Sequence, residues 1–140
     1  MSGEYIPLIV TVLGLVGAAI TYTYQRNVDR KTTLMELRRK AYRDYLRAFL
    51  LMTGTPERDE EIQNSLLAAE FELLVVGSDQ VVKCVGALSQ YYAETNHDRF
   101  NRSGSKVRSL VAEVCRAMRQ DCFEGTDLSI DEIQAIVPIV

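Results

Sequence analysis

The stretch that decides the fold reads IPLIVTVLGLVGAAITYTYQRNVDRK, from Ile6 to Lys31. Most of it belongs to a run of twenty residues, Tyr5 to Tyr24, that contains no charged side chain. About 20 apolar residues in a helix are enough to cross the hydrocarbon layer of a membrane. A helix that is apolar on every face could not be buried inside a domain of this size. Residues 1–24 are therefore predicted to form a short tail and a transmembrane anchor.

The flanks of this run distinguish a permanent anchor from a cleaved signal. A secretory signal begins with positive charge and ends at small residues, whereas this chain begins MSGEY and leaves the run through TYTYQR. Residues 25–47 carry eight basic and three acidic side chains, a net charge of +5; residues 48–140 carry eight basic and fifteen acidic ones, a net charge of −7. Because basic residues favour the cytoplasmic side, we expect the N-terminus outside the cell and residues 25–140 in the cytoplasm.

Two groups of residues in and after the run are candidate contacts for membrane lipids or for another anchor. Arg26, Arg30 and Lys31 follow the run closely enough to meet anionic lipid head groups. Within the run, Gly14, Gly17 and Ala18 are small, and such residues let two membrane helices approach closely. The alternative is that Gly and Ala are simply tolerated in lipid. We expect a homo-oligomer that contacts membrane lipids.

After the anchor, apolar residues recur at helical spacing and no segment alternates as a strand would. Helix-breaking or capping residues separate the segments at Gly54, Pro56, Gly77 and in the polar loop 94–106. Ser105 is the expected N-cap of the helix after that loop, and Ser129 with Glu132 forms a capping box for a short last helix. The sequence predicts an all-α protein. Its transmembrane helix would continue into an antiparallel bundle of four long helices, whose apolar positions span 34–52, 62–76, 81–92 and 107–122, plus the short C-terminal one.

No catalytic or metal-binding pattern is present in the sequence. Cys84, Cys115 and Cys122 fall at apolar helical positions, with neither the pairing of a disulfide framework nor the spacing of a zinc site. His97 is the only histidine, and it lies in the most polar loop. There is no phosphate-binding glycine motif. We therefore expect no enzymatic activity, no metal and no cofactor.

The same loop holds the best candidate for ligand binding. His97, Arg99, Arg102, Lys106 and Arg108 gather positive charge beside Phe100, a combination suited to an anionic or nucleotide-like ligand. The alternative is a solvated loop. A weaker candidate is the turn at Gly77 and Ser78, whose backbone N–H groups could face a phosphate; Asp79, however, already places a carboxylate there, which favours a structural cap.

Two short motifs carry a resemblance to a known group of proteins. LLVVGSDQVV (Leu73–Val82) contains the second turn, and AMRQD (Ala117–Asp121) sets Arg119 and Asp121 in an apolar run. Arg116 and Arg119 near the end of a helix would favour its dipole, and an ion pair with a neighbouring helix is the alternative. These motifs resemble paired signatures of an uncharacterised family of small bacterial single-pass membrane proteins with a cytoplasmic helical bundle. The resemblance implies a bacterial inner-membrane protein and assigns no activity.

The function expected from these observations is a membrane-tethered, non-catalytic interaction or scaffold module. Its partner would be an unknown protein, and nucleic acid is not expected to bind. The alternative is an effector of a bacterial stress or anti-phage system. There the cytoplasmic bundle would sense an anionic or nucleotide ligand and rearrange an oligomer in the membrane.

Overall fold

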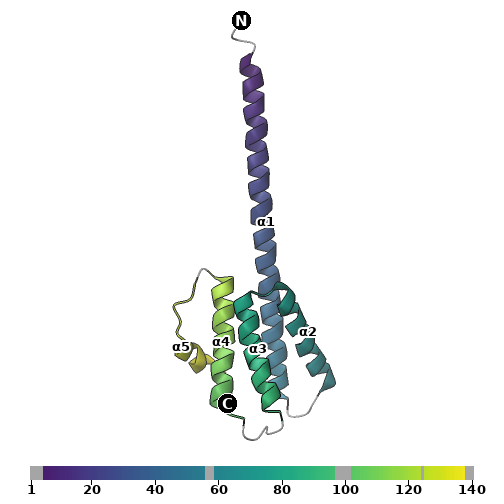
Figure 1. The fold of residues 1–140 in the computed structure, drawn as a ribbon, viewed down its shortest axis with the longest axis vertical. Coiled ribbons are helices and arrows are strands. Elements are labelled where there is room, and N and C mark those ends of the chain that lie inside the picture. The colour runs from purple at the N-terminus through teal and green to yellow at the C-terminus, as the bar shows by residue number, and fades with distance from the viewer. Residues whose placement is uncertain (1–4, 56–58, 97–101, 124, 138–140) are drawn as a thin grey trace. The chain divides into compact units, whose positions relative to one another are not determined.

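The computed structural model describes residues 5–55, 59–96, 102–123 and 125–137. These residues form five α-helices and no strand, so the predicted all-α class is confirmed (Figure 1). The helices are α1 (Tyr5–Gly54), α2 (Glu60–Val76), α3 (Asp79–Glu94), α4 (Gly104–Cys122) and α5 (Ile130–Ile136).

The chain divides into two compact units, residues 1–36 and residues 37–140. The division falls within α1, which contributes to both units. The predicted boundary between the anchor (residues 1–24) and the cytoplasmic part (residues 25–140) marks where the chain is expected to leave the membrane. The division into compact units does not test this boundary, so it stays a prediction.

In the first unit, α1 exposes every described side chain from Pro7 to Leu34. Its threonine hydroxyls donate to carbonyl oxygens one turn earlier, as Thr11 does to Pro7 (2.8 Å) and Thr21 to Gly17 (2.9 Å). Hydroxyls satisfied in this way are compatible with apolar surroundings. By length and composition, α1 is the one helix among the described residues that could cross a membrane, although an N-terminal signal sequence would pass the same test.

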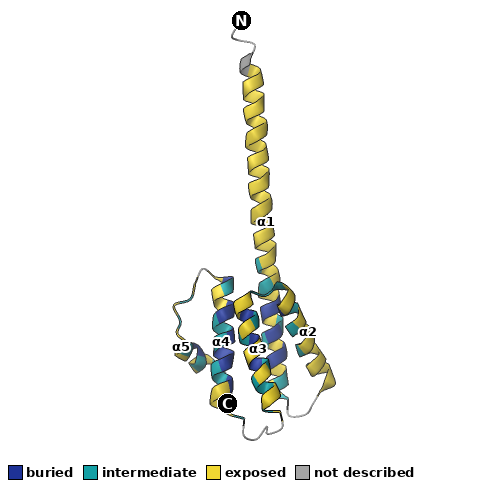
Figure 2. Cartoon of the chain, viewed as in Figure 1, coloured by how far each residue is buried: buried dark blue, intermediate teal, exposed yellow. Residues whose placement is uncertain are grey.

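In the second unit, four helices supply one core. Tyr45 of α1, Leu73 of α2, Leu88 of α3 and Val114 of α4 are the clearest members, and each is almost completely buried. Figure 2 shows the buried residues of this unit concentrated where its helices lie against one another. The described core contains no buried polar or charged residue, so apolar burial is its main stabilising force.

The cysteines belong to this packing. Cys122 is buried, whereas Cys84 and Cys115 are half-buried, and all three are free thiols. Burial raises the pKa of the Cys115 thiol. The predicted placement at apolar helical positions is confirmed, and a raised pKa disfavours the reactive thiolate form.

The helix ends confirm some of the predicted caps and correct others. The capping box at Ser129 is present, with the Glu132 carboxylate accepting the Ser129 backbone N–H at 2.8 Å. The prediction of Ser105 as the cap of α4 is wrong. The N-cap is Ser103, whose hydroxyl accepts the N–H of Lys106, and this leaves Ser105 inside the first turn. Helix α2 begins at Glu60 with Asp59 as its cap, and the expected start at Pro56 lies outside the described residues.

Candidate functional site: a polar network and an exposed apolar face

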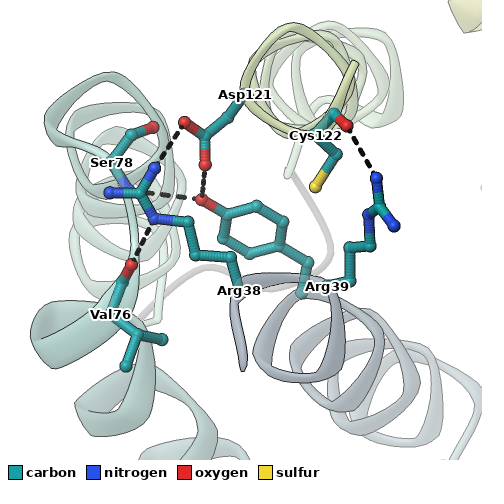
Figure 3. A network of polar contacts seen from close by, with 7 residues as sticks. Arg38, Arg39, Val76, Ser78, Asp121 and Cys122 are labelled. Carbon is teal, nitrogen blue, oxygen red and sulfur yellow. Dashed lines mark hydrogen bonds and ion pairs between the residues drawn. The ribbon is translucent and has the colours of Figure 1, made fainter. Parts of the chain in front are cut away.

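A polar network joins α1 to the ends of three other helices, and Arg38 is at its centre (Figure 3). The Arg38 guanidinium lies with Nη1 3.0 Å from Oδ1 of Asp121, near the end of α4. Its Nε donates to the backbone carbonyl of Val76, the last residue of α2, at 2.7 Å. The last carbonyls of a helix have no partner within the helix and carry partial negative charge, so a cation stabilises this end.

Tyr42 is the second member that α1 contributes, one turn after Arg38. Its hydroxyl donates to Oδ2 of Asp121 and accepts the backbone N–H of Ser78, the N-cap of α3, at 3.2 Å. Burial raises the pKa of the Tyr42 phenol, and the hydrogen bond to Asp121 raises it further. The phenol is therefore protonated at neutral pH and remains a donor to the carboxylate.

Glycine is required at the turn that brings Val76 and Ser78 into this network. The backbone N–H of Gly77 donates to the carbonyl of Leu73 at 2.8 Å, which closes the end of α2. A Cβ atom at Gly77 would lie 2.6 Å from that same carbonyl oxygen, closer than such atoms approach in proteins. The absence of a side chain thus allows α2 to end and α3 to begin within two residues.

A neighbouring set of contacts holds the end of α4 to α1. Arg39 donates to the backbone carbonyl of Cys122 at 3.2 Å. The Phe123 ring lies near two guanidinium groups, those of Arg39 (5.8 Å) and Arg119 (5.7 Å). Arg39 and Arg119 therefore reinforce the end of α4 where Asp121 is placed.

The chemistry available to this network is structural. Both carboxylate oxygens of Asp121 accept hydrogen bonds from within the chain, and both Arg38 and Tyr42 are engaged. The exception is Oγ of Ser78, which is buried and has no hydrogen-bond partner among the residues that the structure describes. Among the described residues, no group of three or more His, Cys, Asp and Glu side chains could hold a metal ion.

The predicted ligand-binding residues are only partly described. Arg102 lies with its guanidinium carbon 4.1 Å from the centroid of the Tyr92 ring, and its Nε donates to the Thr95 hydroxyl at 2.8 Å. Arg102 thus connects the end of α3 to the start of α4. Lys106 is exposed and Arg108 is partly buried, both on α4. His97 and Arg99 lie outside the described residues, so the anion site stays a prediction.

The predicted membrane residues all lie on α1. Arg26, Arg30 and Lys31 are exposed, as are Gly14, Gly17 and Ala18. A Cβ atom at either glycine would meet nothing within 4 Å, so their small size is not needed for packing inside the described chain. Their roles at a lipid surface and in helix pairing stay predictions.

Sequence reasoning missed two of the network residues. By sequence, Arg38 lies with Arg39, Arg43 and Arg47 opposite the apolar positions of its helix, which predicts a solvated side chain, but it is only 22% exposed because it pairs with Asp121. Tyr42 lies outside the apolar repeat of the same helix, which is formed by Leu34, Leu37, Ala41, Tyr45, Ala48, Phe49 and Met52. A signal was present, since residues four apart lie on one face of a helix and Arg38 and Tyr42 are so spaced. For Asp121, the alternative of an ion pair with a neighbouring helix is confirmed.

A second candidate surface is an exposed apolar face on α2. Leu67, Phe71, Leu74 and Val75 are 51%, 60%, 62% and 83% exposed, respectively. Asn64 and Ala68 are also exposed and belong to the same helical face by their spacing. We call these six residues the α2 apolar face. Apolar residues recur along this helix at Ile62, Leu66, Ala69, Leu73 and Val76, and this is the side that meets the core, where Ala69 and Leu73 are buried. Leu67, Phe71 and Leu74, which would broaden that side, remain exposed.

No protein-family model, curated protein or solved structure matches this chain.

Proposed function

We propose that this chain is a membrane-anchored helical interaction module with no catalytic activity of its own. The apolar part of α1 crosses the membrane with the N-terminus outside. Residues 25–140 form a cytoplasmic antiparallel bundle of four long helices plus the short α5. The resemblance of LLVVGSDQVV and AMRQD to small bacterial membrane proteins supports a bacterial inner membrane as its location.

The observation that carries this proposal is the α2 apolar face. Single exposed apolar side chains are ordinary on protein surfaces, but neighbouring large ones mark interaction sites. Phe71 stands within this face, and aromatic residues are enriched in the energetically important parts of interfaces. A surface of this kind suits the binding of a protein better than the binding of a small ligand, which requires a concave site.

The polar network supports a scaffold role for the second unit. Arg38, Tyr42 and Asp121 use their hydrogen-bonding groups to join helix ends. The two motifs that carry the resemblance also meet there, through Ser78 and Asp121. A network saturated by the fold itself holds helices in place, which keeps an interaction face rigid.

The ligand-sensing alternative has less support. Arg102, the residue at the middle of its cationic set, already binds Tyr92 and Thr95 within the fold. Its Nε and Nη2 donate to Thr95 and Tyr92, so part of its hydrogen-bonding capacity is already used within the fold.

The membrane part of the proposal is tested by the intact mass of the protein purified from membranes. A permanent anchor predicts the mass of the whole chain, 15.8 kDa, in the membrane fraction after an alkaline wash. A shorter chain that has lost the apolar run, or release by the wash, would show a cleaved signal or a peripheral protein instead.

The interaction part is tested by affinity capture of the full-length protein in mild detergent. The parent chain is compared with Phe71→Gln and with Leu50→Gln, an exposed apolar residue of α1 that is 48% exposed and lies outside the α2 apolar face. A stoichiometric protein partner, either another copy or a different chain, should be lost from Phe71→Gln alone. Equal capture by all three proteins would contradict the proposal.

A further inference from the structure

The α2 apolar face has the spacing of a helix-pairing seam. Asn64, Leu67, Phe71 and Leu74 are separated by three, four and three residues, which is the repeat that places side chains along one line between two paired helices. The helix is well capped, with Asp59 accepting the N–H of Glu61 at 2.9 Å, so the face lies on a regular element. The question is which surface covers it.

The area of the face matches what a pair of such helices needs. A large side chain presents on the order of 150 Å² when fully exposed, so the four large residues together expose roughly 400 Å². Two such faces in full contact would remove at most about 800 Å² from water, and the neighbouring Asn64 and Ala68 bring the total close to ~1,000 Å², the lower end for a specific interface.

The charge of the face suits a second copy of itself. None of its six residues is charged, so two identical faces can meet without burying like charges among these residues. Of the acidic residues of α2, Glu70 and Glu72 contact Ser89 and Lys40 within the chain, and Glu60 and Glu61 lie at the end of the helix. Asn64 is its one polar residue, and a single Asn within such a seam is a known way to fix the alignment of paired helices. A highly charged partner would find no complementary group on this face.

A lipid surface is a poorer occupant for the same reason. Helices that lie on membranes carry Lys and Arg beside their apolar face. Helix α2 contains no basic residue and has four acidic ones, namely Glu60, Glu61, Glu70 and Glu72. An anionic lipid surface would therefore find no basic side chain beside the α2 apolar face.

We propose that the α2 apolar face packs against the same face of a second copy of this chain, related by a two-fold axis. This inference deepens the proposed function and rests on it in one respect. Anchoring in a membrane confines the copies and raises their effective concentration, which allows an interface of this modest size to form.

The test uses single cysteines introduced into the full-length protein. Ala68→Cys places a thiol on the α2 apolar face, and Ala87→Cys places one at an equally small, exposed position on α3. Membranes containing either variant, or the parent chain, are treated with a short thiol-reactive cross-linker. The parent chain is the control for any cross-linking through the three natural cysteines. The proposal predicts a shift to twice 15.8 kDa for Ala68→Cys, and not for Ala87→Cys or the parent chain.

A second substitution distinguishes a specific pair from chance collisions. Phe71→Gln in the Ala68→Cys chain should abolish the shift while the helical circular dichroism is unchanged, because Phe71 is exposed. Leu50→Gln in the same chain should leave the shift intact. No shift with Ala68→Cys, an adduct with a different protein, or equal shifts for Ala68→Cys and Ala87→Cys would each overturn the proposal.

The two proposals fail in distinguishable ways. If Ala68→Cys gives no doubled mass but Phe71→Gln loses a different captured protein, the interaction module stands and self-pairing is wrong. If the doubled mass appears with a chain that has lost its apolar run, self-pairing stands and the membrane anchor is wrong.

Discussion

Arg38 and Asp121 lie 83 residues apart in the chain, yet their side chains form an ion pair with 3.0 Å between Nη1 and Oδ1. The pair is largely shielded from water, with side chains 22% and 13% exposed. The same carboxylate accepts a hydrogen bond from Tyr42. A single aspartate near the end of α4 thus fixes the position of α1 relative to α4, and through Arg38 and Tyr42 it also reaches the ends of α2 and α3.

Replacing this aspartate should destabilise the second unit. Asp121→Asn removes the charge that pairs with Arg38 and leaves the guanidinium partly buried, which is expected to cost about 1–3 kcal/mol in the free energy of unfolding. The measurement is chemical denaturation of the full-length protein in detergent. The matched control is Asp44→Asn, because Asp44 forms an exposed ion pair with Lys40. That substitution should cost less than about 0.5 kcal/mol. Equal losses for the two variants would contradict the role given to the network.

Helix α3 should depend on Arg102 in a similar way. Arg102→Gln removes the stacking on Tyr92 and the hydrogen bond to Thr95, and it should lower the free energy of unfolding by about 1–2 kcal/mol. Lys106→Gln is the control, because Lys106 is exposed on the next helix and its substitution should have little effect. If neither variant changes stability but both lose binding to a nucleotide probe, Arg102 binds a ligand, and this result would favour the ligand-sensing alternative over the interaction module.

The sequence predicts the elements of this fold better than their faces. Helix bounds at Gly54 and Ser129 follow from local chemistry, since a C-terminal glycine and a capping box depend on residues close by. The width of the buried side of α2 does not follow, because Leu67 at its edge is as apolar as Leu73 at its centre. Only the packing against α1 and α3 decides that Leu73 is buried and Leu67 exposed.

The network was harder to predict because its contacts are distant in sequence. Arg38 and Tyr42 share a helix face, but nothing near them in the chain indicates whether that face meets water or a carboxylate. For the segment that contains the partner Asp121, the sequence leaves open a helix-dipole role for its arginines or an ion pair with a neighbouring helix. Choosing between these alternatives requires knowing which helix end comes beside α1, which is a property of the whole unit.

Stability should fall at alkaline pH, in part through Tyr42. Burial and the hydrogen bond to Asp121 raise its pKa above the ordinary value of 10.0. The folded state therefore holds this proton more tightly than the unfolded state. The resulting stabilisation is complete below pH 10.0 and is lost as the pH rises towards the folded pKa. Unfolding free energies measured from about pH 8 to about pH 11 should decline at the alkaline end.

The contribution of Tyr42 to this decline can be isolated. Tyr42→Phe has no phenol to ionise, so its decline should be shallower than that of the parent chain, although it starts from a lower stability because Ser78 and Asp121 lose a partner. The remaining decline would come from other groups whose pKa is raised by burial, including Tyr92 and Cys115. Parallel pH profiles for the two proteins would show that Tyr42 ionises equally in the folded and unfolded states.

The turn between α2 and α3 should tolerate only glycine at position 77. In Gly77→Ala the new methyl group would lie 2.6 Å from the carbonyl oxygen of Leu73, a backbone atom that cannot move aside without opening the end of α2. We expect a loss of about 1–3 kcal/mol in the free energy of unfolding, in the range of other backbone effects of this kind. The movement should also weaken the bonds that Val76 and Ser78 make to Arg38 and Tyr42.

A second glycine provides a control for which the opposite change in the free energy of unfolding is expected. Gly86 lies within α3, and a Cβ atom there would meet nothing within 4 Å. Gly86→Ala should therefore raise the free energy of unfolding by about 0.5–1 kcal/mol, because alanine loses less conformational entropy in a helix.

Adding Asp121→Asn to Gly77→Ala and to Gly86→Ala then shows whether the strain at Gly77 reaches the polar network. Its cost should be smaller beside Gly77→Ala, where the network is already disturbed, and unchanged beside Gly86→Ala. If Asp121→Asn costs the same in both backgrounds, Gly77 shapes the end of α2 without placing the groups that meet Arg38 and Tyr42.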